Sequence, residues 1–354
     1  MIKPYVVIAV LAVLLAAALP ARAELSVGDP APKFTIDTWL EGAAEDPAAG
    51  KGEKIYVLDF WATWCLPCIY QMPELAEFQR AYRDQGVVVI GVTGPVQGQQ
   101  LEQVRQFLKA RPGGVGYTIG WDSSMRMWDN FLTAAGSEGI PYLFVIGRDG
   151  RIAYHGYESP KAKDAVNDLV AGTFDMERAV ARAQNEPKIR QKFAQLNLAV
   201  MMKNWTQATA LLDEVLELDP TNEQALMWGY QIRVNEMGPT ADVRAWVQAF
   251  IDKHSKDTAS LAAMARLLMM IEEPGERLPD LMLRAARGAH DAGGGKDAEA
   301  TEIYARAAFR VGHLDEAIRL QTLAVESAPK HRQTALAKTL AYYRTCRKLR
   351  DSEF

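Results

Sequence analysis

The sequence has 354 residues, of which 49% are hydrophobic, and its formal net charge is −4. A chain of this length and composition can bury a large core and exceeds the usual size of one domain, so two domains are expected. The small negative charge gives no support for nucleic-acid binding.

The first 23 residues have the pattern of a secretory signal peptide. Lys3 precedes an almost wholly apolar run over residues 5–19, and small residues around Arg22 form a cleavage site that ends at Ala23. An apolar run of this length is short for a membrane-spanning helix, so cleavage is favoured over the alternative of an N-terminal membrane anchor. The mature chain is therefore expected in the periplasm, where disulfides form and persist.

The mature chain begins with a Pro- and Gly-rich entry segment. The alternating run at residues 34–36 predicts an edge strand, and the small and charged residues at 41–53 predict a surface loop. A first central strand is then expected at residues 55–60.

This strand leads into a C-x-x-C motif at residues 65–68, which opens an amphipathic stretch. A cysteine between a strand and a helix lies at the helix N-terminus, where free N–H groups and the macrodipole favour a thiolate. Two intervening residues let the second sulfur fold back onto the first in a reversible disulfide. Zinc is the main alternative, but it takes four ligands and the only other cysteine is Cys346. The motif therefore predicts redox chemistry.

Strands and helices alternate after the motif. A β-branched run at residues 87–92 and apolar residues at helical spacing over 99–110 predict a right-handed βαβ unit. The other expected elements are a helix at 67–83 kinked at Pro73, a strand at 115–119, a helix at 123–133, a strand at 139–146, a hairpin turn at 148–151, a strand at 152–155 and a helix at 160–169.

The motif and its surroundings resemble the active site of thioredoxin. The residues in the matching order and spacing are Asp59, Trp61, Trp64, Cys65, Pro67, Cys68 and Pro73. The sequence F-W-A-T-W-C at residues 60–65 is most similar to the extracytoplasmic disulfide reductases of the TlpA/ResA type. The resemblance covers residues 25–172 and implies an α/β thioredoxin-like domain at 24–174.

The resemblance implies catalytic roles for three residues. Cys65 would attack a client disulfide and Cys68 would resolve the mixed disulfide. Asp59 matches the buried acid of thioredoxin, although TlpA-type proteins often carry Asn there. Because a carboxyl inside a sheet is costly to ionise, Asp59 is expected to stay protonated until needed, and once ionised to take up a proton from the second thiol. A surface carboxylate at the strand end is the alternative.

A second signature lies at Ile140-Pro141, which begins a strand. In thioredoxin-like folds the matching proline is cis and leaves the preceding backbone free to pair with a client, whereas an ordinary trans proline is the general alternative. Trp64, Leu66 and Pro67 complete the expected client-binding residues. Leu66 is a departure from the family, because a large apolar side chain offers no charge to stabilise a thiolate, so the motif does not specify the redox potential.

From about residue 177 the sequence becomes rich in Ala, Leu and Met and typical of helices. The segments 193–220 and 300–329 resemble tetratricopeptide units, each with an Ala followed twelve residues later by Pro. No clean third copy lies between them. We expect an all-α helical-repeat domain of this kind at 175–354. This domain contains three tryptophans, Trp205, Trp228 and Trp246. We expect them in its core, and the alternative is that they anchor a bound peptide.

The predicted function is an exported thiol:disulfide oxidoreductase that reduces client proteins with disulfides. The resemblance implies a membrane thiol donor of the CcdA/DsbD type, and no bound cofactor is needed. An oxidase or isomerase is the alternative with the opposite redox direction. A different class of function is an assembly adaptor, in which the helical domain binds a protein partner and the thioredoxin-like half supplies a docking surface.

Two further chemistries are weaker alternatives. A peroxidase of related fold places its cysteine in a T-x-x-C context, whereas Thr63 lies two residues before Cys65. Copper binding with His155 would follow a related family, but that family spaces its cysteines as C-x-x-x-C. The remaining Cys346 is expected to be a buried, inert side chain, with pairing between subunits as the alternative.

Overall fold

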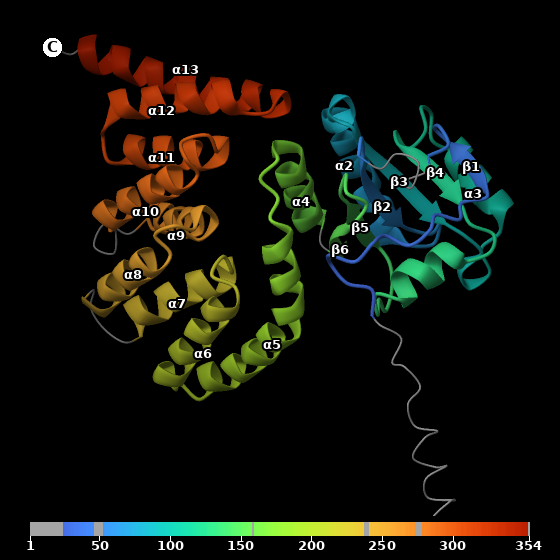
Figure 1. Ribbon diagram of the computed structural model, residues 1–354, viewed down its shortest axis with the longest axis horizontal. Helices are drawn as coiled ribbons and strands as arrows, with labels where there is room; N and C mark the ends of the chain where they lie inside the picture. Colours follow the sequence, from blue (N-terminus) through green and yellow to red (C-terminus); the bar gives the residue numbers. More distant parts are fainter. Residues whose placement is uncertain (1–23, 46–51, 158, 237–240, 273–277, 353–354) are drawn as a thin grey trace, which may run out of the picture. The chain divides into compact units, whose positions relative to one another are not determined.

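The computed structural model describes residues 24–45, 52–157, 159–236, 241–272 and 278–352. The chain divides into two compact units, the first ending at Leu169 and the second beginning at Val170 (Figure 1). The predicted signal peptide at 1–23 and part of the loop predicted at 41–53 lie outside the described residues. Within the described ranges, no helix is both long and apolar enough to cross a membrane.

The first unit is built on a six-stranded mixed sheet with the strand order β1-β4-β3-β2-β5-β6. The strands are β1 (Thr38–Glu41), β2 (Ile55–Phe60), β3 (Val87–Thr93), β4 (Thr118–Trp121), β5 (Tyr142–Ile146) and β6 (Ile152–Gly156). β2, β3 and β4 run parallel, whereas β1, β5 and β6 pair antiparallel with their neighbours. Because β2 lies between β3 and β5, it is buried along its whole length.

Helices connect and cover these strands (Figure 1). They are α2 (Leu66–Tyr82), η1 (Arg83–Gln85), η2 (Val96–Gly98), α3 (Leu101–Lys109), η3 (Trp128–Thr133) and α4 (Ser159–Ala171). α3 returns the chain from β3 to the parallel β4, as the predicted βαβ unit requires. The thioredoxin-like α/β fold expected from the sequence is confirmed.

The two faces of β2 carry different side chains, because successive residues of a strand point to opposite sides. On one face Tyr56, Leu58 and Phe60 join an aromatic core with Phe131 and Phe144. The ring centroids of Phe60 and Phe144 are 5.7 Å apart, in the edge-to-face geometry that aromatic pairs prefer. Asp59 therefore belongs to the opposite face.

Three predicted elements were placed wrongly along the chain. The edge strand expected at 34–36 begins instead at Thr38, because the apolar side chains of the earlier run pack against the core from an irregular segment. The strand expected at 115–119 begins at Thr118, since Gly116 has a φ of 87° that interrupts extended backbone. The helix expected at 123–133 begins only after Met125, whose φ is 61°.

Every regular element in the described part of the second unit is a helix, which confirms its all-α class. The helices are α5 (Met176–Met201), α6 (Trp205–Leu218), α7 (Glu223–Asn235), α8 (Ala241–Lys253), α9 (Thr258–Met270), α10 (Pro279–Ala292), α11 (Ala298–Arg310), α12 (Leu314–Ser327) and α13 (Lys330–Ser352). Several begin at an Asn or Asp that accepts a backbone N–H of the first turn, as Asn204 does for α6 and Asp257 for α9.

Helix pairs in this unit pack through small and aliphatic side chains. The segment 193–220 forms the pair of α5 and α6, with Ala208 and Leu212 fully buried, and the segment 300–329 forms the pair of α11 and α12. Trp228 and Trp246 are half-buried against the same core. This packing agrees with the prediction that these two tryptophans lie in the core.

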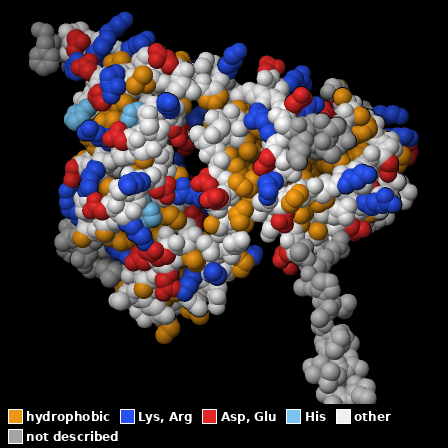
Figure 2. All heavy atoms as spheres, in the orientation of Figure 1, with side chains coloured by type: hydrophobic (Ala, Val, Ile, Leu, Met, Phe, Trp, Pro, Cys, Tyr) orange, Lys and Arg blue, Asp and Glu red, His pale blue; other side chains and the backbone are white. Residues whose placement is uncertain are grey.

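Four ion pairs in the second unit join helices that are two apart in the chain, and their partners are 32 to 36 residues apart. They are Glu217–Lys253, Arg244–Asp280, Asp252–Arg284 and Arg266–Glu299. Acidic and basic side chains are interspersed over the visible face of this unit (Figure 2). Each exposed pair of this kind contributes little to the free energy of unfolding. Their regular spacing along the sequence is therefore more informative about the architecture of the unit than their energy.

Candidate active site

The two cysteines of the motif form a disulfide at the start of α2. Cys65 is the N-cap residue, and the backbone N–H of Cys68 donates to its Sγ at 3.3 Å. Cys65 is 4% exposed and Cys68 is fully buried, so the first sulfur is the more accessible one. Because an N-terminal N–H and the helix macrodipole both favour negative charge, Cys65 is the sulfur suited to a thiolate in the reduced protein.

The loop before the motif is held by a buried amide. Oε1 of Gln99 accepts hydrogen bonds from the backbone N–H and the hydroxyl of Thr63, at 2.7 and 2.8 Å. Its Nε2 donates to the Thr93 hydroxyl and to the Gly94 carbonyl, both at 2.9 Å. Gln99 therefore ties the approach to the motif to the end of β3, and nothing in the sequence pattern singled it out.

Asp59 is fully buried on β2, between Gly91 of β3 and Leu143 of β5. Its Oδ2 accepts the hydroxyl of Tyr117 at 3.0 Å, and its Oδ1 has no hydrogen-bond partner among the described residues. Burial raises the pKa of Asp59 to about 7, and the hydrogen bond from Tyr117 opposes part of that rise. The carboxyl is therefore poised to exchange a proton near neutral pH.

Two hydrogen bonds of one side chain join α2 to β3, the strand next to Asp59. The Nε2 of Gln79 on α2 donates to the Val87 carbonyl of β3 at 3.0 Å, and its Oε1 accepts the Val89 N–H at 2.6 Å. The helix that carries the disulfide is thereby fixed to the strand next to Asp59. The alternative that Asp59 is a surface carboxylate at the strand end is wrong, because no part of Asp59 is exposed.

The peptide bond between Ile140 and Pro141 is cis, as the resemblance implied. Both residues are half-buried and lead directly into β5, which pairs with β2. The loop before them is held by Tyr157, whose hydroxyl oxygen accepts the Glu138 N–H at 3.0 Å. Gly139, which precedes the cis bond, is exposed.

The surface around the motif is apolar. Trp64 is 45% exposed, Leu66 is 62% exposed and Tyr70 is 80% exposed, and Pro67 is also exposed. The indole Nε1 of Trp64 donates to the Val96 carbonyl at 3.4 Å, which orients the ring. Large apolar side chains are rarely grouped on a free surface, so this grouping beside the disulfide is suited to binding another chain.

Two candidate residues remain, His155 and Cys346. His155 is on β6, and its Nδ1 lies 2.7 Å from the Tyr142 hydroxyl. Throughout the described ranges, no group of three or more His, Cys, Asp or Glu side chains is suited to a metal ion. Cys346 on α13 is a free thiol, half-buried against the core of the last helices.

Sequence reasoning missed Tyr117 as well as Gln99. Tyr117 is 58 residues from Asp59 in the chain and was read only as part of a short strand. No local signal identifies it, because the contact exists only once β4 has joined the sheet beside β3.

Comparisons with known proteins identify the family of the chain. The Redoxin family matches residues 26–171. Thiol-disulfide oxidoreductase ResA of Geobacillus thermodenitrificans is 30% identical over 131 residues, which cover 37% of this chain and 69% of that protein. The chain belongs to the ResA-type thiol-disulfide oxidoreductases. In this ResA-type enzyme the two cysteines of the C-x-x-C motif, Cys65 and Cys68, form a disulfide.

Other similar proteins match different shares of this ResA-type chain. Protein FixW of Rhizobium leguminosarum is 27% identical over 213 residues, which cover 55% of this chain and 92% of that protein. A solved thioredoxin-family thiol:disulfide interchange protein from Chlorobium tepidum is 27% identical, covers 41% of this chain and 96% of its own, and has a TM-score of 0.33.

Proposed function

We propose that this ResA-type enzyme works as an exported reductase for disulfides of extracytoplasmic client proteins. The observation that carries the proposal is the combination of an N-cap sulfur at Cys65, a buried second sulfur at Cys68 and a fully buried carboxyl at Asp59. The three groups divide the work among a nucleophile, a resolving thiol and a proton acceptor.

The reaction consumes the dithiol form of the enzyme. The Cys65 thiolate attacks a client disulfide, and one client sulfur leaves as a thiol after taking up a proton. Cys68 then transfers its proton to Asp59 and attacks the Cys65 sulfur of the mixed disulfide, which releases the second client sulfur. Two electrons pass to the client, and the enzyme ends as the Cys65–Cys68 disulfide.

The proposed client surface surrounds this pair. Trp64, Leu66 and Pro67 offer exposed apolar area for client side chains. The backbone before the cis bond at Ile140-Pro141 is accessible at Gly139 and would pair with an extended client segment. A client with apolar residues next to its cysteine therefore fits this surface best.

The electrons must be supplied from outside the chain. We propose a membrane thiol donor of the CcdA/DsbD type, because each turnover leaves the Cys65–Cys68 disulfide and a dithiol must reduce it again. Export through a cleaved signal peptide at 1–23, giving a periplasmic enzyme, belongs to the same proposal, with an N-terminal anchor as the alternative.

A redox titration tests the direction of electron flow. The Cys65–Cys68 pair is equilibrated with glutathione or thioredoxin buffers and the fraction of dithiol is measured. A potential near about −270 mV supports reduction of clients, whereas a potential near about −120 mV identifies an oxidase instead. Cys346→Ser is the matched control, because its two remaining thiols should give the same potential.

A trapping experiment tests the clients. Cys68→Ala leaves Cys65 able to attack but unable to be resolved, so mixed disulfides accumulate and retain their partners. Cys65→Ala in the same cells is the control and should retain nothing. If Cys68→Ala captures no exported protein while the titration shows a cycling disulfide, the client proposal is wrong but the redox chemistry stands.

We further infer that the second unit is a helical repeat that binds a protein partner. Support comes from its consecutive helix pairs and from ion pairs spaced by 32 to 36 residues, close to a tetratricopeptide period of about 34. The adaptor alternative is tested with a Cys65→Ser, Cys68→Ser double variant. If that variant fully supports the cellular role, binding by the second unit is the main function and catalysis is secondary.

A further inference from the structure

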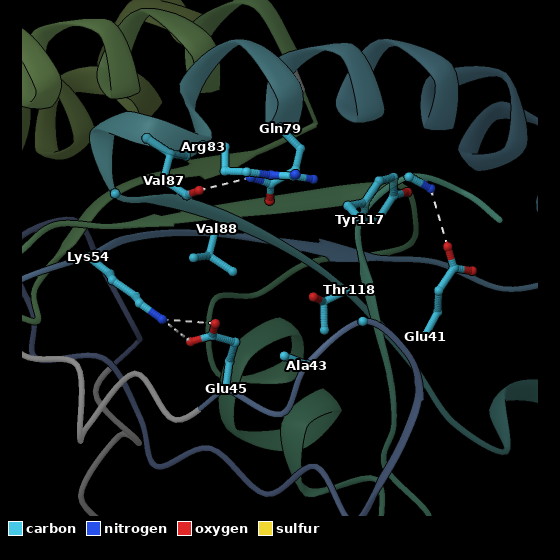
Figure 3. Close-up of a pocket in the computed structure, with 13 residues that line it drawn as sticks. Glu41, Ala43, Glu45, Lys54, Gln79, Arg83, Val87, Val88, Tyr117 and Thr118 are labelled. Atoms are coloured by element: carbon cyan, nitrogen blue, oxygen red, sulfur yellow. Dashed lines mark hydrogen bonds and ion pairs between the residues drawn. The ribbon is translucent and has the colours of Figure 1, made fainter. Parts of the chain in front are cut away.

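A cavity of about 500 Å³ lies beside the sheet of the first unit, near the C-terminal end of α2, which contributes Gln79 to its lining (Figure 3). Its lining includes Glu41 next to β4, Gln79 on α2 and Tyr117 just before β4. Lys54 and Glu45 form an ion pair at another part of the lining, with 2.8 Å between Nζ and Oε2. None of the chemistry described above uses this cavity.

Tyr117 belongs to both the cavity and the active site. It lines the cavity, yet it is only 5% exposed and its hydroxyl donates to Asp59 Oδ2 at 3.0 Å. Its ring is tightly enclosed, because a Cβ added at Gly91 would lie 3.2 Å from Tyr117 Cε2. A Cβ added at Gly116 would lie 3.0 Å from the Cβ of Ala76 on α2. Tyr117 therefore contacts both the cavity and the fully buried acid.

We propose that Tyr117 is a positioning residue that orients the Asp59 carboxyl through its hydroxyl and shields it from the cavity with its ring. The proposal rests on the proton-acceptor role proposed for Asp59. The hydrogen bond occupies Oδ2 and leaves Oδ1, which has no other partner among the described residues, as the oxygen that accepts the proton of Cys68.

Charged groups around Tyr117 favour its neutral form. Burial and the nearby carboxylates of Asp59 and Glu41 raise the pKa of Tyr117 well above its ordinary value, and Arg111 opposes them only in part. The other charged groups on the cavity lining are Arg83 and the Lys54–Glu45 pair. Tyr117 therefore acts as a hydrogen-bond donor throughout the working pH range.

The hydroxyl of Tyr117 should lower the pKa of Asp59 by donating to it, and the ring should raise that pKa by excluding water. Two substitutions at this position separate the two effects. Tyr117→Phe keeps the ring and removes the donor, which should move the pH midpoint of the Asp59-dependent step upward by about one unit. Tyr117→Ala removes the donor but opens the wall, so water from the cavity can hydrate the carboxylate. Its midpoint should move below that of Tyr117→Phe.

The experiment measures the rate at which the reduced full-length chain is oxidised by oxidised glutathione between pH 5 and 9. The same proteins are examined by infrared spectroscopy, which follows the protonated carboxyl of Asp59 directly. Tyr230→Phe is the matched control, because Tyr230 is a buried tyrosine of the second unit. Its profile should equal that of the wild type.

The Asp59→Asn background decides between positioning and a general structural effect. In that background Tyr117→Phe should change neither the midpoint nor the rate, because the group it acts through is gone. If Asp59→Asn alone leaves the wild-type profile unchanged, the proposed role of Asp59 is wrong. If Asp59→Asn flattens the profile but folded Tyr117→Phe keeps the wild-type midpoint, the role of Asp59 stands and the inference about Tyr117 is wrong.

Discussion

The two units differ in where their important contacts come from. In the first unit, the site assembles residues that are distant in sequence, such as Asp59 with Tyr117 and Thr63 with Gln99. In the second unit, most packing joins helices that follow one another along the chain. A local change in the second unit should therefore have local effects, whereas a change in the first can reach the chemistry from far away.

The units also differ in what they bury. The first buries the carboxyl of Asp59, whose Oδ1 has no hydrogen-bond partner among the described residues. The core of the second is mainly alanine and aliphatic side chains, and its buried carboxyl at Asp219 is paired with Arg182. Because a buried polar atom without a hydrogen bond costs stability, the carboxyl of Asp59 is expected to lower the stability of the first unit.

The largest effect is expected for Cys65→Ser. Removing the nucleophile should lower disulfide reductase activity on the order of 1,000-fold or more, because a serine hydroxyl is not ionised at neutral pH. The activity is measured as reduction of a protein disulfide with dithiothreitol as the donor. Cys346→Ser is the control and should retain full activity. An equal loss in both variants would contradict the assignment of the site.

Asp59→Asn should stabilise the first unit at high pH. The pKa of Asp59 is raised from 3.8 to about 7, so the unfolded chain ionises first and stability falls as pH rises through that window. Above pH 7 the ionised Asp59 lowers the free energy of unfolding by at most about 4 kcal/mol, at about 1.4 kcal/mol per pKa unit. Hydrogen exchange of β2 at pH 4 and pH 8 measures it. No gain at pH 8 relative to pH 4 would contradict the raised pKa.

Leu212→Ala should destabilise the second unit by about 3 kcal/mol, because it leaves a cavity in the fully buried contact of α5 with α6. Hydrogen exchange should accelerate in these helices and leave β2 and β3 unchanged. The reductase activity should also stay within about twofold of the wild type. These results would show that a change in the second unit does not reach the chemistry of the first. Loss of protection in the sheet would show that the units do not behave independently.

The smallest effect is expected for Glu217→Ala, which breaks an exposed ion pair with Lys253. The free energy of unfolding of the second unit should fall by no more than about 1 kcal/mol, and less at high salt. Chemical denaturation at two salt concentrations measures it, with Lys253→Ala as the partner variant. A loss of several kcal/mol would mean that the regularly spaced pairs stabilise the repeat directly.

Where sequence prediction failed in the first unit, the pattern reflected packing rather than strand pairing. The apolar residues Phe34 and Ile36 alternate as in a strand, but they pack against the core from an irregular segment. The residues before Thr118 were read as extended, but the left-handed φ of Gly116 delays the strand. Periodicity records which side chains are buried and does not record which backbone groups are paired.

By itself, the sequence determined the chemistry and the class of each half. The C-x-x-C motif after a buried strand specified the disulfide pair, because the spacing of two cysteines at a helix start is a local property. Only the tertiary structure decided the environment of Asp59 and of the loop before the motif. The burial of Asp59, its hydrogen bond from Tyr117 and the support of Thr63 by Gln99 arise only when the strands assemble, since these partners are 58 and 36 residues apart.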